Sequence, residues 1–305
     1  MTMKTATSET AWESGRLDSL SGNKRLLFGQ MYEDAELDRA VLAGKHRIFC
    51  IASAGDTAIC LAKGHVVVAC DINPVQLGFA ERRFLGAPRT IGDAEKVMRF
   101  ARAFMPLVGW LPSLVRRFLA LSDPAEQSAF WTRHLDTFRF RLGSDFLFCR
   151  PVLRAVYASE FLSFVPPHFG AVMRGRMERC FRLHANASNP YARALLLGEF
   201  PDAMPKEPAT KDHFPVKFVL GDAASYLESC PERSFDGFTL SNILDGATDS
   251  YRLRLSRAVR RAATEDAIVI LRSFAEPPAD LKQNHASEDR AMLWGVVDIR
   301  PVRDF

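Results

Sequence analysis

The sequence predicts a doubly wound α/β sheet whose second and third strands are separated by a large helical insertion. Two observations predict this fold. Short apolar runs that suit buried parallel strands alternate with segments of helical spacing, first before residue 85 and again after residue 212. The stretch between them, roughly residues 85 to 212, is too long for an ordinary crossover connection.

The first strand, helix and strand occupy part of the N-terminal third. Each part has a local signal, namely an apolar run for a strand, a turn with a glycine, or a helix boundary at glycine or Asn-Pro. In chain order the parts are a strand at Arg47–Ala52, a turn at Ser53–Asp56, a helix through Leu61 that Gly64 ends, a strand at His65–Asp71 and a helix opened by Asn73-Pro74. This order is typical of a right-handed βαβ unit.

Four further strands are expected after the insertion, with two helical segments among them. The strands are Val216–Asp222, Phe235–Asn242, Asp266–Ser273 and Leu293–Pro301, and the helical segments are Ala223–Glu228 and Tyr251–Ala263. The predicted organisation has three parts. Residues 1–84 hold an N-terminal helix and the first half of the sheet domain, residues 85–212 form a helical cap, and residues 213–305 form the second half.

The insertion is rich in leucine, phenylalanine and arginine, and prolines punctuate it. Pro201–Pro215 is polar and rich in proline, so we interpret it as the linker back to the sheet. Arg102–Val115 is apolar but too short to span a bilayer, contains two prolines and is followed by Arg116-Arg117. We interpret it as a buried cap helix in preference to a contact with a membrane surface.

The composition argues against several classes of protein. The 305 residues include 40 basic and 36 acidic ones, a formal charge of +4 that is too mild to indicate a nucleic-acid partner. The first thirty residues contain no apolar signal core, so a cytoplasmic protein without a transmembrane segment is expected. The six cysteines form no Cys-x-x-Cys pair and no histidines cluster at ligand spacing, so neither disulfides nor a metal are expected.

Polar residues gather where the predicted strands end, which is one edge of a parallel sheet. The turn after the first strand holds one glycine, Gly55, whereas a dinucleotide pyrophosphate needs three spaced glycines. A nucleoside needs one close backbone approach and an acid for its ribose hydroxyls, and Asp71 follows Gly55 by sixteen positions. Asp222 follows the third strand and Ser241-Asn242 the fourth. This ordered set predicts binding of S-adenosylmethionine (SAM), with a role as helix N-cap as the alternative for each aspartate.

The sequence also resembles the DUF3419 family. The resemblance lies in LFGQMYEDAELD (Leu27–Asp38), ASAGDTAICLAKGHVVVACDINPVQLGFAERR (Ala52–Arg83) and LSNILD (Leu240–Asp245). The first stretch is similar to the family's Gln-x-Trp-Glu-Asp motif, with Tyr32 in place of the tryptophan. The family includes the BtaA-type enzymes of betaine-lipid synthesis, which move the 3-amino-3-carboxypropyl group of SAM to diacylglycerol.

The resemblance implies a Rossmann-like, SAM-binding domain of the class I methyltransferase type. It implies that Gln30, Tyr32 and Glu33 lie near the amino acid end of SAM. Together with the strand ends, it gives these remaining predicted SAM-binding residues: Ser53, Ala54, Gly55, Asp56, Thr57, Asp71, Ile72, Gln76, Asp222, Ala223, Ser241 and Asn242.

The expected reaction attacks the γ-carbon of the aminocarboxypropyl group and releases 5′-methylthioadenosine. The attacking group is either an external acceptor, such as diacylglycerol or a small molecule, or the amine of SAM itself, which closes azetidine-2-carboxylate. Ring closure needs a neutral α-amine, which a dry pocket under a helical cap favours. A SAM-dependent methyltransferase and a non-catalytic SAM-binding protein are the alternatives.

Four residues are candidates for the catalytic part of the site. Tyr191 and Asn186 lie beside an apolar helix of the insertion, where capping around Pro190 is their alternative role. Asp245 follows the fourth strand and is suited to act as a base or to bind the substrate amine. Tyr32 has ordinary packing of an N-terminal helix as its alternative. Aromatic residues are abundant in the cap; most are expected to be core, and a ring face near the sulfonium would stabilise the cation.

Overall fold

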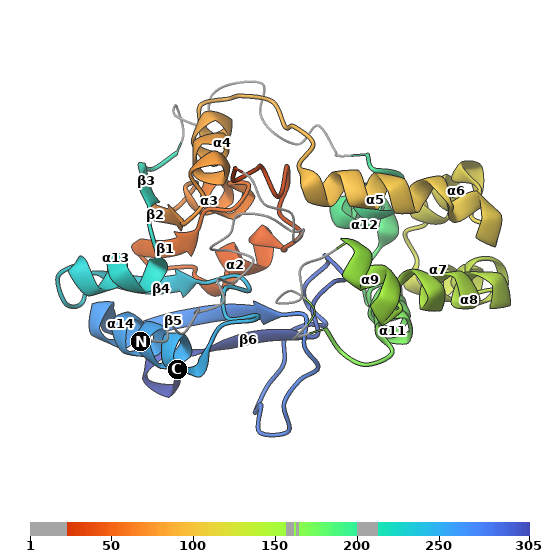
Figure 1. The fold of residues 1–305 in the computed structure, drawn as a ribbon. Helices are drawn as coiled ribbons and strands as arrows, with labels where there is room; N and C mark the ends of the chain where they lie inside the picture. The colour runs from red at the N-terminus through yellow and green to blue at the C-terminus, as the bar shows by residue number, and fades with distance from the viewer. Residues whose placement is uncertain (1–22, 157–161, 163–164, 200–212) are drawn as a thin grey trace, which may run out of the picture.

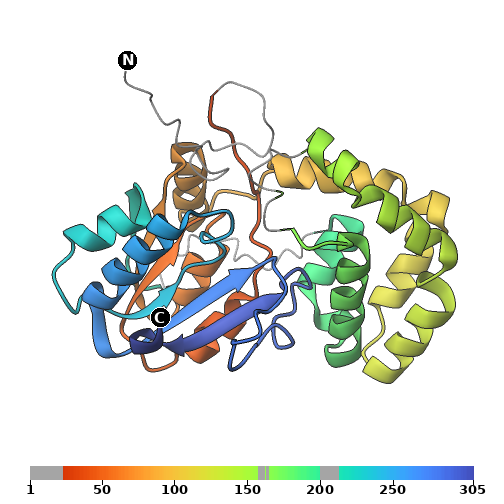
Figure 2. The same cartoon turned by 60° about the horizontal axis from the view of Figure 1, so that its bottom comes forward.

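The structure is a computed structural model that describes residues 23–156, 162, 165–199 and 213–305. A mostly parallel sheet with helices on both faces forms one part of the molecule, and a lobe of helices stands beside it (Figure 1). In the view of Figure 2 the same lobe lies to the right of the sheet.

The sheet has six strands in the order β3-β2-β1-β4-β5-β6. Neighbouring strands are parallel except β5 and β6, which are antiparallel. The strands are β1 (Arg47–Ile51), β2 (Val66–Asp71), β3 (Val216–Leu220), β4 (Phe235–Thr239), β5 (Ala263–Ser273) and β6 (Val296–Pro301). This order confirms the doubly wound α/β fold, and the direction of winding reverses between β1 and β4.

Helices cover both faces of the sheet because successive side chains of each buried strand point to opposite faces. In β1, Ile48 and Cys50 join the core beneath one helical layer, whereas Phe49 joins the core beneath the other. The first layer holds α2 (Ala35–Val41), α3 (Asp56–Leu61) and α4 (Pro74–Phe84), and the second holds α13 (Ala223–Ser229) and α14 (Asp249–Ala262).

The insertion between β2 and β3 is helical, as the sequence predicts. Its described helices are α5 (Asp93–Ala103), α6 (Pro112–Leu119), α7 (Pro124–Phe130), α8 (Phe138–Leu147), α9 (Arg150–Val156), α11 (Phe169–Leu183) and α12 (Pro190–Leu197). This helical lobe has a core of its own in which Trp110, Phe118, Trp131 and Phe181 are buried. Most of the predicted return linker, residues 201–212, lies outside the described residues.

The apolar stretch Arg102–Val115 is not one buried helix. It contains the end of α5, the short 3₁₀ helix η1 (Met105–Val108) and the start of α6. Pro106 and Pro112 have no backbone N–H to donate, so a continuous helix cannot run through them. Trp110 and Val115 are buried, but other apolar side chains of the stretch are exposed. Within the described residues, no helix has the length and apolarity needed to cross a membrane.

The lobe is tied to the sheet domain through a buried arginine of α11. Arg176 donates from Nη1 to the carbonyl of Leu293 at 2.6 Å and from Nη2 to that of Phe274 at 2.8 Å. Gly295 leaves the space for this guanidinium, since a Cβ there would lie 2.3 Å from Nη2 of Arg176. The long loop between β5 and β6 therefore joins the lobe to the sheet.

A second buried arginine, Arg272 of β5, holds the residues before and within α2. Its guanidinium donates to Asp38 at 2.5 Å and to Asp289 at 2.9 Å, and it lies 3.6 Å from Glu33. Thr239 at the end of β4 also donates to Asp38, at 2.7 Å. All of these side chains are buried, so their charges lose contact with water on folding. The ion pairs and hydrogen bonds compensate for that lost hydration.

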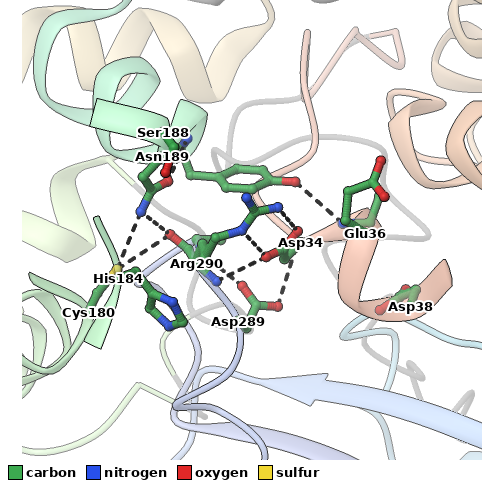
Figure 3. Close-up of polar contacts among 12 residues, drawn as sticks. Asp34, Glu36, Asp38, Cys180, His184, Ser188, Asn189, Asp289 and Arg290 are labelled. Atoms are coloured by element: carbon green, nitrogen blue, oxygen red, sulfur yellow. Dashed lines mark hydrogen bonds and ion pairs between the residues drawn. The ribbon is translucent and has the colours of Figure 1, made fainter. Parts of the chain in front are cut away.

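Arg290 extends this network toward the lobe. It donates to Asp34 from Nε at 2.5 Å and from Nη2 at 2.6 Å, next to Asp289 (Figure 3). The carbonyl of Arg290 accepts from Asn189, whose Oδ1 also caps the first turn of α12 (Figure 3). We call Glu33, Asp34, Asp38, Arg272, Asp289 and Arg290 the buried ionic network.

Replacement of Arg272 by methionine tests this network. Arg272→Met leaves Asp38 and Asp289 buried without their cation, so the free energy of unfolding should fall by about 3–5 kcal/mol. Arg39→Met is the matched control, because Arg39 forms an exposed pair with Glu36 and should lose less than about 1 kcal/mol. Urea denaturation measures both, and similar losses in the two variants would contradict the role of Arg272.

Candidate functional site

A cavity of about 810 Å³ opens at the carboxyl edge of the sheet. The turns after β1, β2, β3 and β4 line it, as do residues of the segment before α2 and of the start of α14. This is the place where the direction of winding reverses, and ligands of doubly wound sheets bind there. Of the predicted SAM-binding residues, these line the cavity: Ser53, Asp71, Ile72, Gln76, Asp222, Ala223, Ser241 and Asn242.

Asp71 is the acid at the end of β2. Its Oδ2 accepts the backbone N–H of Ser53 at 3.0 Å and its Oδ1 accepts that of Asn73 at 2.8 Å. Ser53 has a positive φ of 42°, which turns the chain after β1 so that its N–H faces the carboxylate. Burial raises the pKa of Asp71 to about 6, so the group is mostly ionised at neutral pH. Each oxygen keeps a lone pair with which it can accept a ligand hydroxyl.

Asp222 serves as the N-cap of α13 at the next strand end. Its carboxylate accepts the backbone N–H of Ser225 at 2.8 Å and the hydroxyl of Tyr251 at 2.5 Å. Burial acts to raise the pKa of Asp222, but the bonds from Tyr251 and Ser225 outweigh it and the pKa lies below its usual value. The capping alternative is therefore confirmed, and this capped carboxylate still faces the cavity.

Gln76 lines the cavity, but its amide binds protein backbone. Its Oε1 accepts the N–H groups of Leu27 and Phe28 at 3.0 and 3.1 Å, and its Nε2 donates to the carbonyl of Phe28 at 2.8 Å. Asn73 likewise donates to the carbonyl of Arg25. These bonds hold the segment before α2 across the strand ends, so Gln76 shapes the cavity through that segment.

The rest of the turn after β1 lies behind the cavity wall. Gly55 has a φ of 89°, and a Cβ there would lie 3.1 Å from the side chain of Ala80 in α4. Asp56 is paired with Arg83 at 2.8 Å and Arg89 at 2.9 Å, and it accepts the N–H of Met31. Ala54 and Thr57 are fully buried. The glycine is thus needed for packing of α3 against α4, and the structure does not bring these four residues to the cavity.

Ser241, in the turn after β4, connects the cavity to the buried ionic network. Its φ of 52° directs the hydroxyl to Glu33, to which it donates a hydrogen bond. Burial raises the pKa of Glu33 to about 7, against the opposing charge of Arg272. A carboxyl group that titrates near neutral pH therefore lies one hydroxyl away from the cavity.

Asp245 supports this turn from behind. Its oxygens accept from the hydroxyl of Ser273 at 2.5 Å, the N–H of Phe274 at 3.1 Å and the amide of Asn242 at 3.2 Å. It is buried and is not among the residues that line the cavity. The structure therefore places Asp245 where it orients Asn242, and not where a base would meet a substrate.

The other predicted catalytic residues also lie away from the cavity. The hydroxyl of Tyr191 lies 3.4 Å from the backbone nitrogen of Ala35, and Asn186 is buried in the lobe, where it donates to the carbonyl of Phe118. Tyr32 is buried against residues of the lobe. Gln30, a predicted SAM-binding residue, accepts from Arg89 at 2.8 Å and does not line the cavity either. Among the described residues, none from the helical lobe lines the cavity.

The alternative considered for Gln30 and Tyr32, packing as part of an N-terminal helix, is wrong about the helix. Both precede α2, which begins at Ala35, and their backbone is irregular. Sequence analysis also missed Tyr251 and Phe28, which line the cavity. Tyr251 could have been found from its place at the start of the helix after the fourth strand, since that position faces the same edge of the sheet.

Comparison with known proteins gives little similarity. No model of a protein family matches the chain. No curated protein matches it. Two solved structures described as the rRNA methyltransferase aviRa from Streptomyces viridochromogenes align with 81% of this chain and 74% of that chain, at 13% and 14% identity and TM-scores of 0.31 and 0.32. At this similarity neither structure assigns a reaction or a substrate to this chain.

The contact between Glu33 and Ser241 predicts a pH dependence of stability. Because its pKa is raised in the folded state, neutral Glu33 stabilises the protein below its unfolded pKa, and this contribution is lost as the pH rises through about 7. Glu33→Gln cannot ionise, so between pH 5 and pH 8 it should gain about 3 kcal/mol of unfolding free energy relative to the unsubstituted protein.

Glu36→Gln is the control for this experiment, because the pKa of Glu36 is lowered and the group stays ionised across that range. Chemical denaturation at the two pH values gives the difference. An unchanged pH dependence in Glu33→Gln would show that Glu33 does not titrate there.

Proposed function

We propose that the chain is a SAM-dependent enzyme that transfers the 3-amino-3-carboxypropyl group of SAM to an external acceptor and releases 5′-methylthioadenosine. The observation that carries the SAM part is the cavity at the carboxyl edge of the sheet with Asp71 in its wall. A volume of about 810 Å³ lies within the ~300–1,000 Å³ typical of sites for small ligands.

The residues of the cavity fit an adenosine. Asp71 offers carboxylate lone pairs for the two ribose hydroxyls, and it needs no rearrangement because two backbone N–H groups hold it. Ile72, Ala223 and Ile243 provide apolar surface beside it for a purine. Gly55, the single glycine of the turn, packs against Ala80, so the turn has no free glycine at which a pyrophosphate could approach the backbone closely. This donor set supports a nucleoside sulfonium over a dinucleotide.

The resemblance to the DUF3419 family supports attack at the γ-carbon. SAM supplies an electrophilic γ-carbon and a thioether leaving group, so the protein mainly has to position the acceptor and exclude water. The motif that carries the resemblance, Gln30 to Asp34, places Glu33 against Ser241 in the cavity wall. Ser241 and Asn242 are the polar groups that would orient the amino acid end, and Phe28 offers an aromatic ring in the same cavity.

The lining of the cavity supports an external acceptor over ring closure. A dry pocket beneath the helical cap would favour the neutral amine that ring closure needs, but no described residue of the lobe contributes to the lining. The volume is in the upper part of the usual range, so it has space for an acceptor beside SAM. Glu33, through the hydroxyl of Ser241, is the group placed to take up the proton that a hydroxyl or amine acceptor loses.

The binding part of the proposal is tested by Asp71→Ala. Loss of the ribose acceptor should weaken SAM binding at least about tenfold, since a hydrogen bond to a charged group contributes roughly 1.5–3 kcal/mol. Asp236→Ala is the matched control, because Asp236 also accepts two backbone N–H groups but lies at the opposite edge of the sheet. Titration calorimetry measures both affinities, and equal affinities would remove Asp71 from the site.

The chemistry is tested by mass spectrometry of the products formed from SAM, first without and then with an acceptor such as diacylglycerol in vesicles. The proposal expects 5′-methylthioadenosine whose formation increases with the correct acceptor. Azetidine-2-carboxylate from SAM alone would show ring closure instead. S-adenosylhomocysteine would show methyl transfer, and bound but unchanged SAM with every acceptor would favour a non-catalytic binding protein.

A further inference from the structure

The helical lobe exposes large apolar side chains in two neighbouring rows. The first row runs from α5 through η1 to the start of α6 and contains Phe100, Phe104, Leu107 and Leu111, which are 50–73% exposed. Phe100 and Phe104, four residues apart, lie on the same side of the last turn of α5, whereas Leu107 lies in η1 and Leu111 directly precedes α6. Phe100 and Phe104 also contact each other, with ring centroids 4.9 Å apart.

The second row lies on α8. It contains Phe138, Leu142 and Phe146, which follow one another at intervals of four residues and are 60–78% exposed. The two rows are neighbours, because η1 packs on α8 where Val108 meets Gly143. A Cβ on Gly143 would lie 2.7 Å from Cγ1 of Val108. We call these seven side chains the apolar face of the lobe.

Positive charge accompanies this face. From the start of α5 to the end of α9, residues 93–156 contain ten lysines and arginines against six aspartates and glutamates, a net charge of +4 that equals the total of the whole chain. Arg99 and Arg139 are exposed and next in sequence to Phe100 and Phe138. On α6, Arg117 is exposed beside the ring of Phe130, and Arg116 is exposed but paired with Glu199. Long arginine stems can lie along apolar surface while their guanidinium groups reach polar surroundings.

We propose that the apolar face of the lobe binds the surface of an anionic lipid bilayer. Phenylalanine and leucine side chains on one side of surface helices enter the boundary between head groups and acyl chains, and basic residues beside them attract anionic lipids. Charge argues for an anionic bilayer over a second copy of this chain, because two such faces would bring exposed arginines, Arg99 and Arg139 among them, against their own copies. The interaction is with the bilayer surface, since no described helix can span the membrane.

This binding is independent of the proposed reaction. None of the seven side chains lines the cavity at the carboxyl edge of the sheet. The test therefore needs no SAM and has no enzymatic readout, so either proposal can fail without the other.

The experiment measures sedimentation of the full chain with vesicles of phosphatidylcholine alone or with phosphatidylglycerol added. Binding should require the anionic lipid and weaken as salt is raised. In the double variant Leu107→Glu with Phe146→Glu, two carboxylates replace one side chain of each row, and binding should fall at least about tenfold. Leu85→Glu with Leu253→Glu is the matched control, because both leucines are similarly exposed but lie on the sheet domain.

Three results would overturn the proposal. The first is no binding to anionic vesicles, and the second is equal binding by the two double variants. The third is a dimer of the unsubstituted chain in analytical ultracentrifugation that Leu107→Glu with Phe146→Glu abolishes, while vesicles bind neither protein. The apolar face would then be an interface between copies of the chain. Circular dichroism of both double variants ensures that a folded lobe is compared.

Discussion

The burial of Arg272 is the constraint on which the rest of the sheet domain depends. This guanidinium at the end of β5 has no access to solvent, so carboxylates from elsewhere in the chain must surround it. Asp38 comes from α2, Glu33 from the segment before it, and Asp289 from the loop between β5 and β6. One cation thus joins β5 and the loop after it to α2 and the segment before α2, which lie more than two hundred residues away in sequence.

The cavity is a consequence of this arrangement. The segment before α2 crosses the carboxyl edge of the sheet because its far end is fixed by the ionic network and its near end by the amide of Gln76. Ser241 then bonds to Glu33 from the cavity side. The hydrogen bond between Ser241 and Glu33 therefore connects the cavity wall directly to the buried ionic network. A change in the ionisation of Glu33 acts directly on a residue that lines the cavity.

The helical lobe has a separate relation to the sheet. Arg176 and Asn189 fasten it to the loop between β5 and β6, and its described residues do not reach the cavity. Its own core is filled by tryptophan and phenylalanine, yet the seven side chains of the apolar face remain outside that core. Burial of these seven would require a partner surface, and the arginines beside them indicate its charge.

Local sequence patterns were sufficient to predict the architecture. A run of apolar residues or an Asn-Pro pair determines the strand or the helix start at its own position in the chain. The strands, the helical insertion and the strand-end residues Ser53, Asp71 and Ser241 follow from such patterns. The hydrogen-bond partners of four other residues could not be predicted in this way, because they lie 25 to 156 residues away in sequence and only packing brings them together. These residues are Asp56, Gln76, Asp245 and Tyr191. A polar side chain beside a strand end predicts a site equally well whether it faces a ligand or a distant backbone group. Tertiary structure alone decides between them, since a buried polar group must bond to whichever partner the fold brings to it.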